Sequence, residues 1–178
     1  MRVITIDFET YYSREYSLSK MTTEAYIRDP RFEVIGVGIK VDDNPPDWYS
    51  GEDVGRFLNS LDYSEDAILA HNTVFDGAIL SWLYGIKPKF WFDTLSMARP
   101  FHHSTVGGSL KALANFYNLG QKGDEIIQGL GKKRKDFSPQ ELDRYADYCL
   151  QDINLTYKLY EKLRQKVPVS ELMIIDQT

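Results

Sequence analysis

Two carboxylates directly follow an apolar, β-branched run near the start of the chain. Asp7 and Glu9 stand in the sequence ITIDFET, residues 4–10. Because alternate residues of a strand share a face, both side chains can point at one spot. Two carboxylates crowded at the end of a buried strand repel each other unless a cation joins them. An isolated pair of this kind is more often a solvated strand end, so a metal site needs further carboxylates downstream.

Two later acids occupy positions that suit the same chemistry. Asp76 follows the apolar run 67–72 at a strand-to-helix junction, and falls in the first helical turn near the positive end of the dipole. Asp152 lies inside a long helix, four residues after Tyr148 and therefore on the same helix face. Aspartate is a poor residue for a helix interior and needs a partner among apolar neighbours. Taken singly, Asp76 is typical of an ordinary helix start, and Tyr148 with Asp152 of a packing contact.

Taken together, four carboxylates and an aromatic hydroxyl match two-metal phosphodiester hydrolysis. Two divalent ions about 4 Å apart can activate water and stabilise both the attacking and the leaving oxygen. Ligands that are all oxygen favour Mg²⁺ or Mn²⁺ over zinc. The sequence therefore predicts a two-ion site.

Composition narrows the class of protein. The chain has 178 residues, enough for one domain, with 43% hydrophobic and 26% charged residues, which is typical of a globular protein in water. No apolar run reaches membrane-spanning length and the N-terminus is not a signal peptide, so we expect a cytoplasmic protein (host cytoplasm if phage-encoded) without a membrane partner. The one cysteine, Cys149, excludes an internal disulfide and a cysteine-rich zinc site. A net charge of −5 argues against nonspecific coating of nucleic acid, but not against an enzyme whose acidic site is neutralised by metal.

The elements that must position these residues alternate between strand and helix, which indicates an α/β layer fold. The longest helix is announced by Ser138-Pro139-Gln140-Glu141, a capping box with proline at the first position, and we expect Pro168 to end it. Loops are expected over most of 11–31, over 119–137 with its basic run 132–135, and around the polar pair 102–103. Strands are expected at 2–8, 33–41, 47–49, 67–72 and 89–93, and helices at 23–27, 53–61, 75–84, 110–117 and 139–163.

At the four carboxylates and Tyr148, the sequence resembles the DEDD superfamily of 3′–5′ exonucleases. The resemblance implies a ribonuclease H-like fold, with a mixed five-stranded sheet flanked by helices. The first motif is matched by Asp7 and Glu9, the second by Asn72-x-x-x-Asp76, and the third by Tyr148-x-x-x-Asp152.

The third motif is similar to that of the tyrosine subclass. The histidine subclass would place histidine at position 147, where this chain has Asp147. Residues 92–94, 108–114 and 139–163 resemble the proofreading domain of phage family A DNA polymerases. The resemblance implies an exonuclease domain over residues 1–167. It also implies that 168–178, which begins another amphipathic stretch, starts a segment leading to a polymerase domain of the same chain.

The resemblance also assigns roles within the site. Asp7 would bridge two Mg²⁺ or Mn²⁺ ions, Glu9 and Asp152 would hold the ion that carries the attacking water, and Asp76 would act on the second ion. Tyr148 would orient the water. A tyrosine with its ordinary pKa of about 10 is a poor base at neutral pH, so the metal would do most of the deprotonation.

Three flanking residues are expected to bind substrate. Thr10 would contact the terminal nucleotide, Asn72 would hydrogen-bond the scissile strand, and Phe75 would either pack against a base or fill the core, with neither favoured. The substrate would be a single-stranded DNA 3′ end, and a mispaired terminus would enter more readily because it frays. We expect a monomer.

Two other functions remain open from the sequence. A stand-alone 3′–5′ exoribonuclease would use the same motifs. A catalytically silent domain that binds nucleic acid or scaffolds a polymerase would usually lack one or more carboxylates, whereas all four and the tyrosine are present here.

Overall fold

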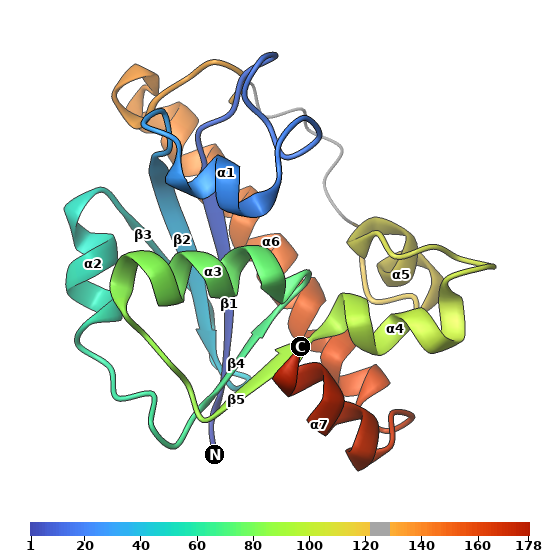
Figure 1. Cartoon of the computed structure of the whole chain (residues 1–178). Helices are drawn as coiled ribbons and strands as arrows, with labels where there is room; N and C mark the ends of the chain where they lie inside the picture. The colour runs from blue at the N-terminus through green and yellow to red at the C-terminus, as the bar shows by residue number, and fades with distance from the viewer. Residues whose placement is uncertain (122–128) are drawn as a thin grey trace.

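A mixed five-stranded sheet forms the centre of the molecule (Figure 1). The computed structural model describes residues 1–121 and 129–178. The strand order is β3-β2-β1-β4-β5, with β1 antiparallel to β2 and parallel to β4. This confirms the expected five strands and the mixed sheet. Their bounds are β1 (Val3–Thr10), β2 (Val34–Val41), β3 (Asp47–Ser50), β4 (Ala67–Ala70) and β5 (Phe90–Asp93).

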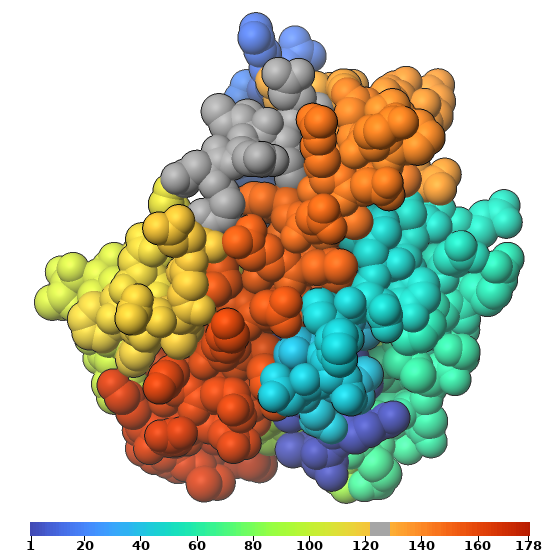
Figure 2. Space-filling model, turned by 180° about the vertical axis from the view of Figure 1, so that it is seen from behind, coloured from blue at the N-terminus to red at the C-terminus, as the bar shows by residue number. Residues whose placement is uncertain are grey.

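Helices cover both faces of the sheet. In Figure 1, α3 crosses in front of the strands, α2 lies beside them next to β3, and α6 passes behind them. Figure 2 shows α6 running across the rear face, from the orange upper part to the red lower part. The helices are α1 (Thr23–Arg28), α2 (Glu52–Leu58), α3 (Thr73–Tyr84), α4 (Thr94–His102), α5 (Leu110–Phe116), α6 (Pro139–Leu163) and α7 (Val169–Gln177), with a short 3₁₀ turn, η1 (Arg134–Asp136).

The residues of β1 alternate between two hydrophobic cores. Ile4, Ile6 and Phe8 belong to the core on the α3 side, whereas Val3 belongs to the core that contains the α6 leucines. Because side chains alternate along a strand, the odd-numbered residues after Val3 face the α6 layer. This alternation decides which helix the carboxylates Asp7 and Glu9 meet.

The long helix α6 begins as the sequence predicts. Ser138 Oγ accepts from the Glu141 N–H at 3.2 Å, and Glu141 Oε2 accepts from the Ser138 N–H at 2.8 Å, so the capping box is present. Its end at Leu163 confirms the expected range 139–163, and Pro168 lies beyond it. Pro168 instead precedes α7, where its fixed φ suits the residue before a helix.

Helix α4 was not expected from the sequence. The Asp93 side chain accepts from the Leu95 N–H at 3.0 Å and starts the helix, while Pro100 lies inside it. The interior proline hides this helix in the sequence. The polar loop expected at 102–103 is therefore wrong for His102, which ends α4, is buried, and has its Nε2 atom 2.6 Å from the Tyr117 hydroxyl.

The edge strand β5 is covered by α7. The Trp91 N–H donates to Asp176 Oδ1 at 2.7 Å, so a side chain of α7 satisfies a backbone donor of the edge strand. Within the residues that the structure describes, no helix is both long and apolar enough to cross a membrane.

Candidate metal and nucleic-acid site

The carboxylates gather where β1 extends beyond its neighbour β4. The two strands pair only from Val3↔Ala67 to Thr5↔Leu69. Further along, β1 still pairs with β2, with Asp7 opposite Gly38. One side of β1 is thus open to other groups at the carboxyl end of the parallel strands. In α/β sheets, ligands commonly bind at this end.

Asp7 and Glu9 lie on one face of this open end, as expected. Each offers a carboxylate oxygen, and these atoms and Cys149 Sγ all lie within 4.8 Å of one another. Both acids are half-buried, so water screens their repulsion only in part.

Cys149 connects α6 to this pair. Its Sγ lies 3.4 Å from the Asp7 carbonyl oxygen and 3.6 Å from Asp7 Oδ2. Burial, followed by the negative charges of Asp7 and Glu9, raises the pKa of the Cys149 thiol. The protonated thiol can donate a weak hydrogen bond to Asp7, and this contact links α6 to β1.

Asp76 reaches the same end of β1 from the opposite helical layer. Its Oδ1 atom accepts from the Phe8 N–H at 2.9 Å, on the stretch of β1 that β4 does not reach. Burial first, and the charge of Asp7 second, raise the pKa of Asp76. The repulsion shows that the two carboxylates interact, which is the situation that a bound cation relieves.

Asp152 and Tyr148 come from the middle of α6. Asp152 is buried and lies three residues after Cys149, so the two share a helix face. The next residue, Ile153, packs against Gly38, which pairs with Asp7. Tyr148 is half-buried one turn before Asp152. The helix thus brings its predicted residues to the level of Asp7 in the sheet.

Gly38 allows this close approach of α6. A Cβ atom at this position would lie 2.6 Å from Ile153 Cδ1 and 2.8 Å from Cys149 Sγ. Only glycine leaves room for both side chains, so the separation of helix and strand depends on it.

Sequence reasoning missed Tyr145, which lies on the buried face of α6. Its ring stacks on that of Phe137 and meets Trp48 of β3 edge-on. Burial, followed by the charge of Glu9, raises the pKa of Tyr145. The sequence signal was its place one turn before Cys149 on the buried face, which could not reveal the contact with a distant strand.

The three predicted substrate-binding residues differ in how far their side chains are exposed. Thr10 is buried, and its hydroxyl is 2.9 Å from that of Tyr26. Asn72 is exposed in a left-handed conformation, with φ of 75°. Phe75 is half-buried and packs against the core, with its ring centroid 6.0 Å from that of Tyr26. Only Asn72 has a side chain that is largely accessible.

The basic run 132–135 is held mostly by acids and hydroxyls of the chain itself. Lys132 Nζ lies 2.7 Å from Glu141 Oε1. The Arg134 N–H donates to Glu33 Oε1 at 2.6 Å, and Arg134 Nε donates to Ser50 Oγ at 2.7 Å. Arg134 is nevertheless exposed, as expected of a solvated loop, whereas Lys132 is half-buried. Residues 122–128 of the expected loop lie outside the described residues.

A neighbouring acid, Asp93, has a different role. It accepts from the Asn72 N–H at 2.8 Å, from the Leu95 N–H at 3.0 Å and from the Ser96 hydroxyl at 2.7 Å. It also lines a hollow of about 440 Å³ among α3, β5, α4 and α7, but none of the four predicted metal-binding carboxylates lines that hollow. Asp93 therefore joins strand ends to helix starts, and we assign no ligand to the hollow.

The donors present suit a hard divalent cation. Asp7 and Glu9 offer carboxylate oxygens within 4.8 Å of each other, and Asp76 accepts from the backbone of the same stretch of β1. Among the described residues, neither Asp76 nor Asp152 belongs to that close group, and Asp152 is buried on α6. Such oxygen sets are typical of Mg²⁺ and Mn²⁺. The raised pKa of Asp76 beside Asp7 is consistent with a site whose charge is balanced when a cation binds.

Solved structures share this architecture. No protein-family model and no curated protein matches the sequence. The chain aligns with NrnC of Brucella melitensis with bound Mg²⁺, at 18% identity over 92% of this chain and 72% of that one, with a TM-score of 0.64. It aligns with the RNase D–GMP complex of Trypanosoma brucei at 17% identity over 98% of this chain and 56% of that one, with a TM-score of 0.71. A family B DNA polymerase from the archaeon Pyrobaculum calidifontis matches at 20% identity over 92% of this chain and 24% of its own, with a TM-score of 0.66.

These likenesses establish a fold. The chain has the ribonuclease H-like architecture expected from the sequence. At identities of 20% or less, the activity of the neighbours does not transfer by likeness alone. The function has to be argued from the site.

Proposed function

We propose that the chain is a divalent-metal-dependent 3′–5′ exonuclease of the DEDD superfamily, tyrosine subclass. The observation that carries the proposal is the meeting of acids from different elements at the open end of β1. Asp7 and Glu9 lie within 4.8 Å of each other there, and Asp76 interacts with Asp7 from the α3 side.

The residues would share the work as follows. Asp7, Glu9, Asp76 and Asp152 would hold two Mg²⁺ or Mn²⁺ ions. Bound ions would supply an activated water and stabilise the charge that develops on the phosphodiester oxygens. Tyr148 would orient the attacking water through its hydroxyl.

DNA at single-stranded 3′ ends is the substrate that we propose, in the setting of polymerase proofreading. The family B polymerase supports this, because the region that aligns with this chain is 24% of the polymerase chain. The same fold thus occurs there as one part of a DNA polymerase. The polymerase domain of the same chain, a monomeric state and a cytoplasmic location are parts of this proposal. An exoribonuclease is the second candidate, because the RNase D neighbour aligns with 98% of this chain at the higher TM-score.

Labelled single strands would test the proposal. DNA and RNA of the same sequence, carrying a 5′ label, are incubated with the protein in Mg²⁺ and in Mn²⁺. A descending ladder, lost in the Asp7→Ala/Glu9→Ala double variant, is the expected result. Faster shortening of RNA would favour the exoribonuclease. No cleavage of either strand with either metal would contradict the proposed function and favour a silent binding or scaffold domain.

A further inference from the structure

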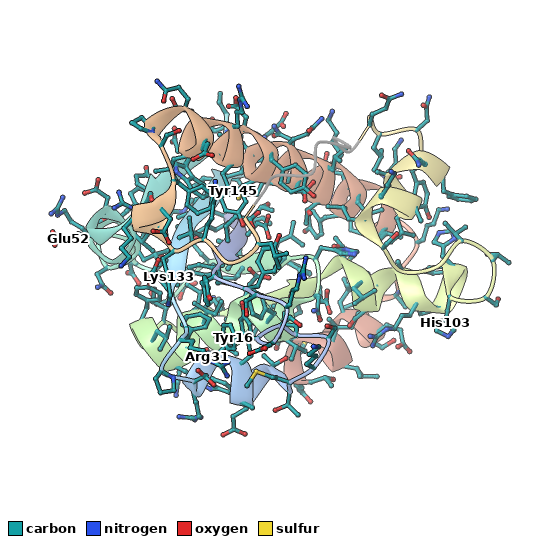
Figure 3. All side chains as sticks on the ribbon, turned by 90° about the horizontal axis from the view of Figure 1, so that it is seen from above. Tyr16, Arg31, Glu52, His103, Lys133 and Tyr145 are labelled. Carbon is teal, nitrogen blue, oxygen red and sulfur yellow. The ribbon has the colours of Figure 1, made fainter. Side chains whose placement is uncertain are left out.

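The α4–α5 unit, residues 94–121, lies at the same end of the sheet as the acidic site. Strand β5 is parallel to β4, which is parallel to β1, so α4 begins where the carboxyl ends of these strands meet. The His71 ring links the unit to β4, with Nδ1 2.8 Å from Thr94 Oγ1 and Nε2 2.8 Å from the Gly108 carbonyl oxygen. Figure 3, which looks down on this end of the sheet, shows α4 leading away from it to the turn that carries His103. The unit therefore extends sideways from the site.

This unit differs from the rest of the chain in its charge. The chain has 26 acidic residues among 178, so a stretch of 28 residues would hold about four on average, but residues 94–121 contain none. They contain the cations Arg99 and Lys111, and α6 adds Lys158, whose Nζ lies 3.4 Å from the Leu119 carbonyl oxygen. In a chain with a net charge of −5, such a surface suits an anionic partner.

Two phenylalanine rings are exposed on this surface. Phe101 is 42% exposed and Phe116 is 56% exposed. Both rings lie against the buried His102, with centroids 6.2 and 4.7 Å from that of the imidazole. The Tyr117 hydroxyl is 2.6 Å from His102 Nε2 and 3.3 Å from Lys166 Nζ. The two exposed rings therefore rest on a packed, hydrogen-bonded base that carries a further cation.

Exposed aromatic rings among cations are the groups on which single-stranded nucleic acid stacks. Every base has a π-face that can stack on an aromatic side chain, while lysine and arginine contact the phosphates. Helix α4 rises about 12 Å from Thr94 to His102, at 1.5 Å per residue. A nucleic-acid strand advances about 3.4 Å per nucleotide, so the two rings are about four nucleotides away from a 3′ end held at the acids.

We propose that Phe101 and Phe116 form a second contact for a single-stranded nucleic acid whose 3′ end occupies the acidic site. Bases about four nucleotides from that end stack on the two rings, and Lys158 and Lys166 contact neighbouring phosphates. This inference rests on the proposed function and adds to it a preference for strands that are long enough to reach the rings.

Two single strands of different length test the inference. A trinucleotide is too short to reach the rings, whereas an oligothymidylate of about 12 nucleotides spans them. In fluorescence anisotropy with the labelled longer strand in EDTA, Phe101→Ala/Phe116→Ala should raise the dissociation constant at least about fivefold, which corresponds to the loss of one stacked base. In Mg²⁺, the double variant should raise KM for the longer strand, keep kcat, and cleave the trinucleotide with the wild-type kcat/KM.

Trp82→Ala is the matched control. Trp82 is also an aromatic residue on a helix and is 45% exposed, but it lies in the last turn of α3, where the Arg28 guanidinium packs over its ring at 4.9 Å. This variant should bind the longer strand as the wild type does. Lys166→Gln tests the phosphate contact separately, and should reduce the slope of log affinity against log salt by about 0.7. Thermal melts of all variants would show whether any of them loses structure.

An unchanged affinity of the double variant for the longer strand would overturn the inference and favour a protein partner on this surface. Equal losses with the trinucleotide would also overturn it, because the rings would then act on the site itself. A wild-type chain that binds the longer strand through the two rings but cleaves nothing would overturn the proposed nuclease and leave this contact standing. Wild-type cleavage of both strands by the double variant would overturn the contact alone.

Discussion

Replacing Gly38 by alanine should disturb the packing of α6 against the sheet and, as a result, the acidic site. An added Cβ would lie 2.6 Å from Ile153 Cδ1. Carbon atoms in good contact are about 3.5–4.0 Å apart, so the helix or the side chain must retreat by about 1 Å. Ile153 and Cys149 are both fully buried, which leaves no open space for a new rotamer.

The expected cost follows from overpacking. Extra methyl groups in a well-packed core typically cost about 1–3 kcal/mol. For a chain of this size, each kcal/mol lowers the melting temperature by about 2–4 °C, so the loss should be about 2–12 °C. A displacement of about 1 Å between catalytic groups can cost about 100-fold in rate, so cleavage should fall more than stability suggests.

Differential scanning fluorimetry and the strand-shortening assay would measure the two effects. Gly55→Ala is the matched control, because a Cβ in this interior position of α2 would lie 3.6 Å from its nearest neighbour, Tyr84 Cε1. That variant should gain about 0.5–1 kcal/mol, since alanine restricts the unfolded chain and favours helix. If Gly38→Ala melted like Gly55→Ala and cleaved like the wild type, the close seating of α6 on β2 described here would be refuted.

Three further outcomes follow from the charges. Saturating Mn²⁺, at about 100 times its dissociation constant, should stabilise the protein by about 2.7 kcal/mol in thermal melts, and Asp7→Asn should remove most of that gain. Because the pKa of Asp76 is raised in the folded state, the stability of the metal-free protein should increase as the pH falls from neutral toward about 3.9, the pKa of Asp76 in the unfolded chain. Without metal at pH 7, Asp76→Asn should therefore melt at a higher temperature than the wild type. A lower melting temperature would contradict this. The hydrogen bond from Arg2 lowers the pKa of Asp66, so the ionised Asp66 stabilises the fold above about pH 3.9. This stabilisation is lost as the pH falls through the lowered pKa of Asp66. In melts across pH 2–7, the melting temperature of Asp66→Asn should therefore converge with that of the wild type only at the acid end.

Local patterns predicted much of the fold. The strands around β1 and the capping box of Ser138 and Glu141 depend on neighbours in sequence, and the structure confirms them. Helix α4 depends instead on a cap from Asp93 and on packing that outweighs the cost of Pro100, and neither is visible in the periodicity.

The candidate site was likewise predictable from the sequence only in part. The shared face of Asp7 and Glu9 follows from strand geometry, so the sequence was enough to predict it. The edge-on contact of Tyr145 with Trp48 joins α6 to β3, and no local pattern encodes such a contact. The interaction of Asp76 with the open edge of β1 likewise depends on how far β4 extends, which a strand prediction accurate to a few residues does not specify.

The contact between Cys149 and Asp7 also constrains how the protein can be made. The two residues are 142 positions apart in the chain. During synthesis, β1 leaves the ribosome before α6 and can pair early with β2, but its acidic end meets α6 only after the 142 positions between them have been made. Contacts between such distant segments form late, because a long loop must close first. The nascent chain can therefore build most of its sheet before it can assemble the acidic site.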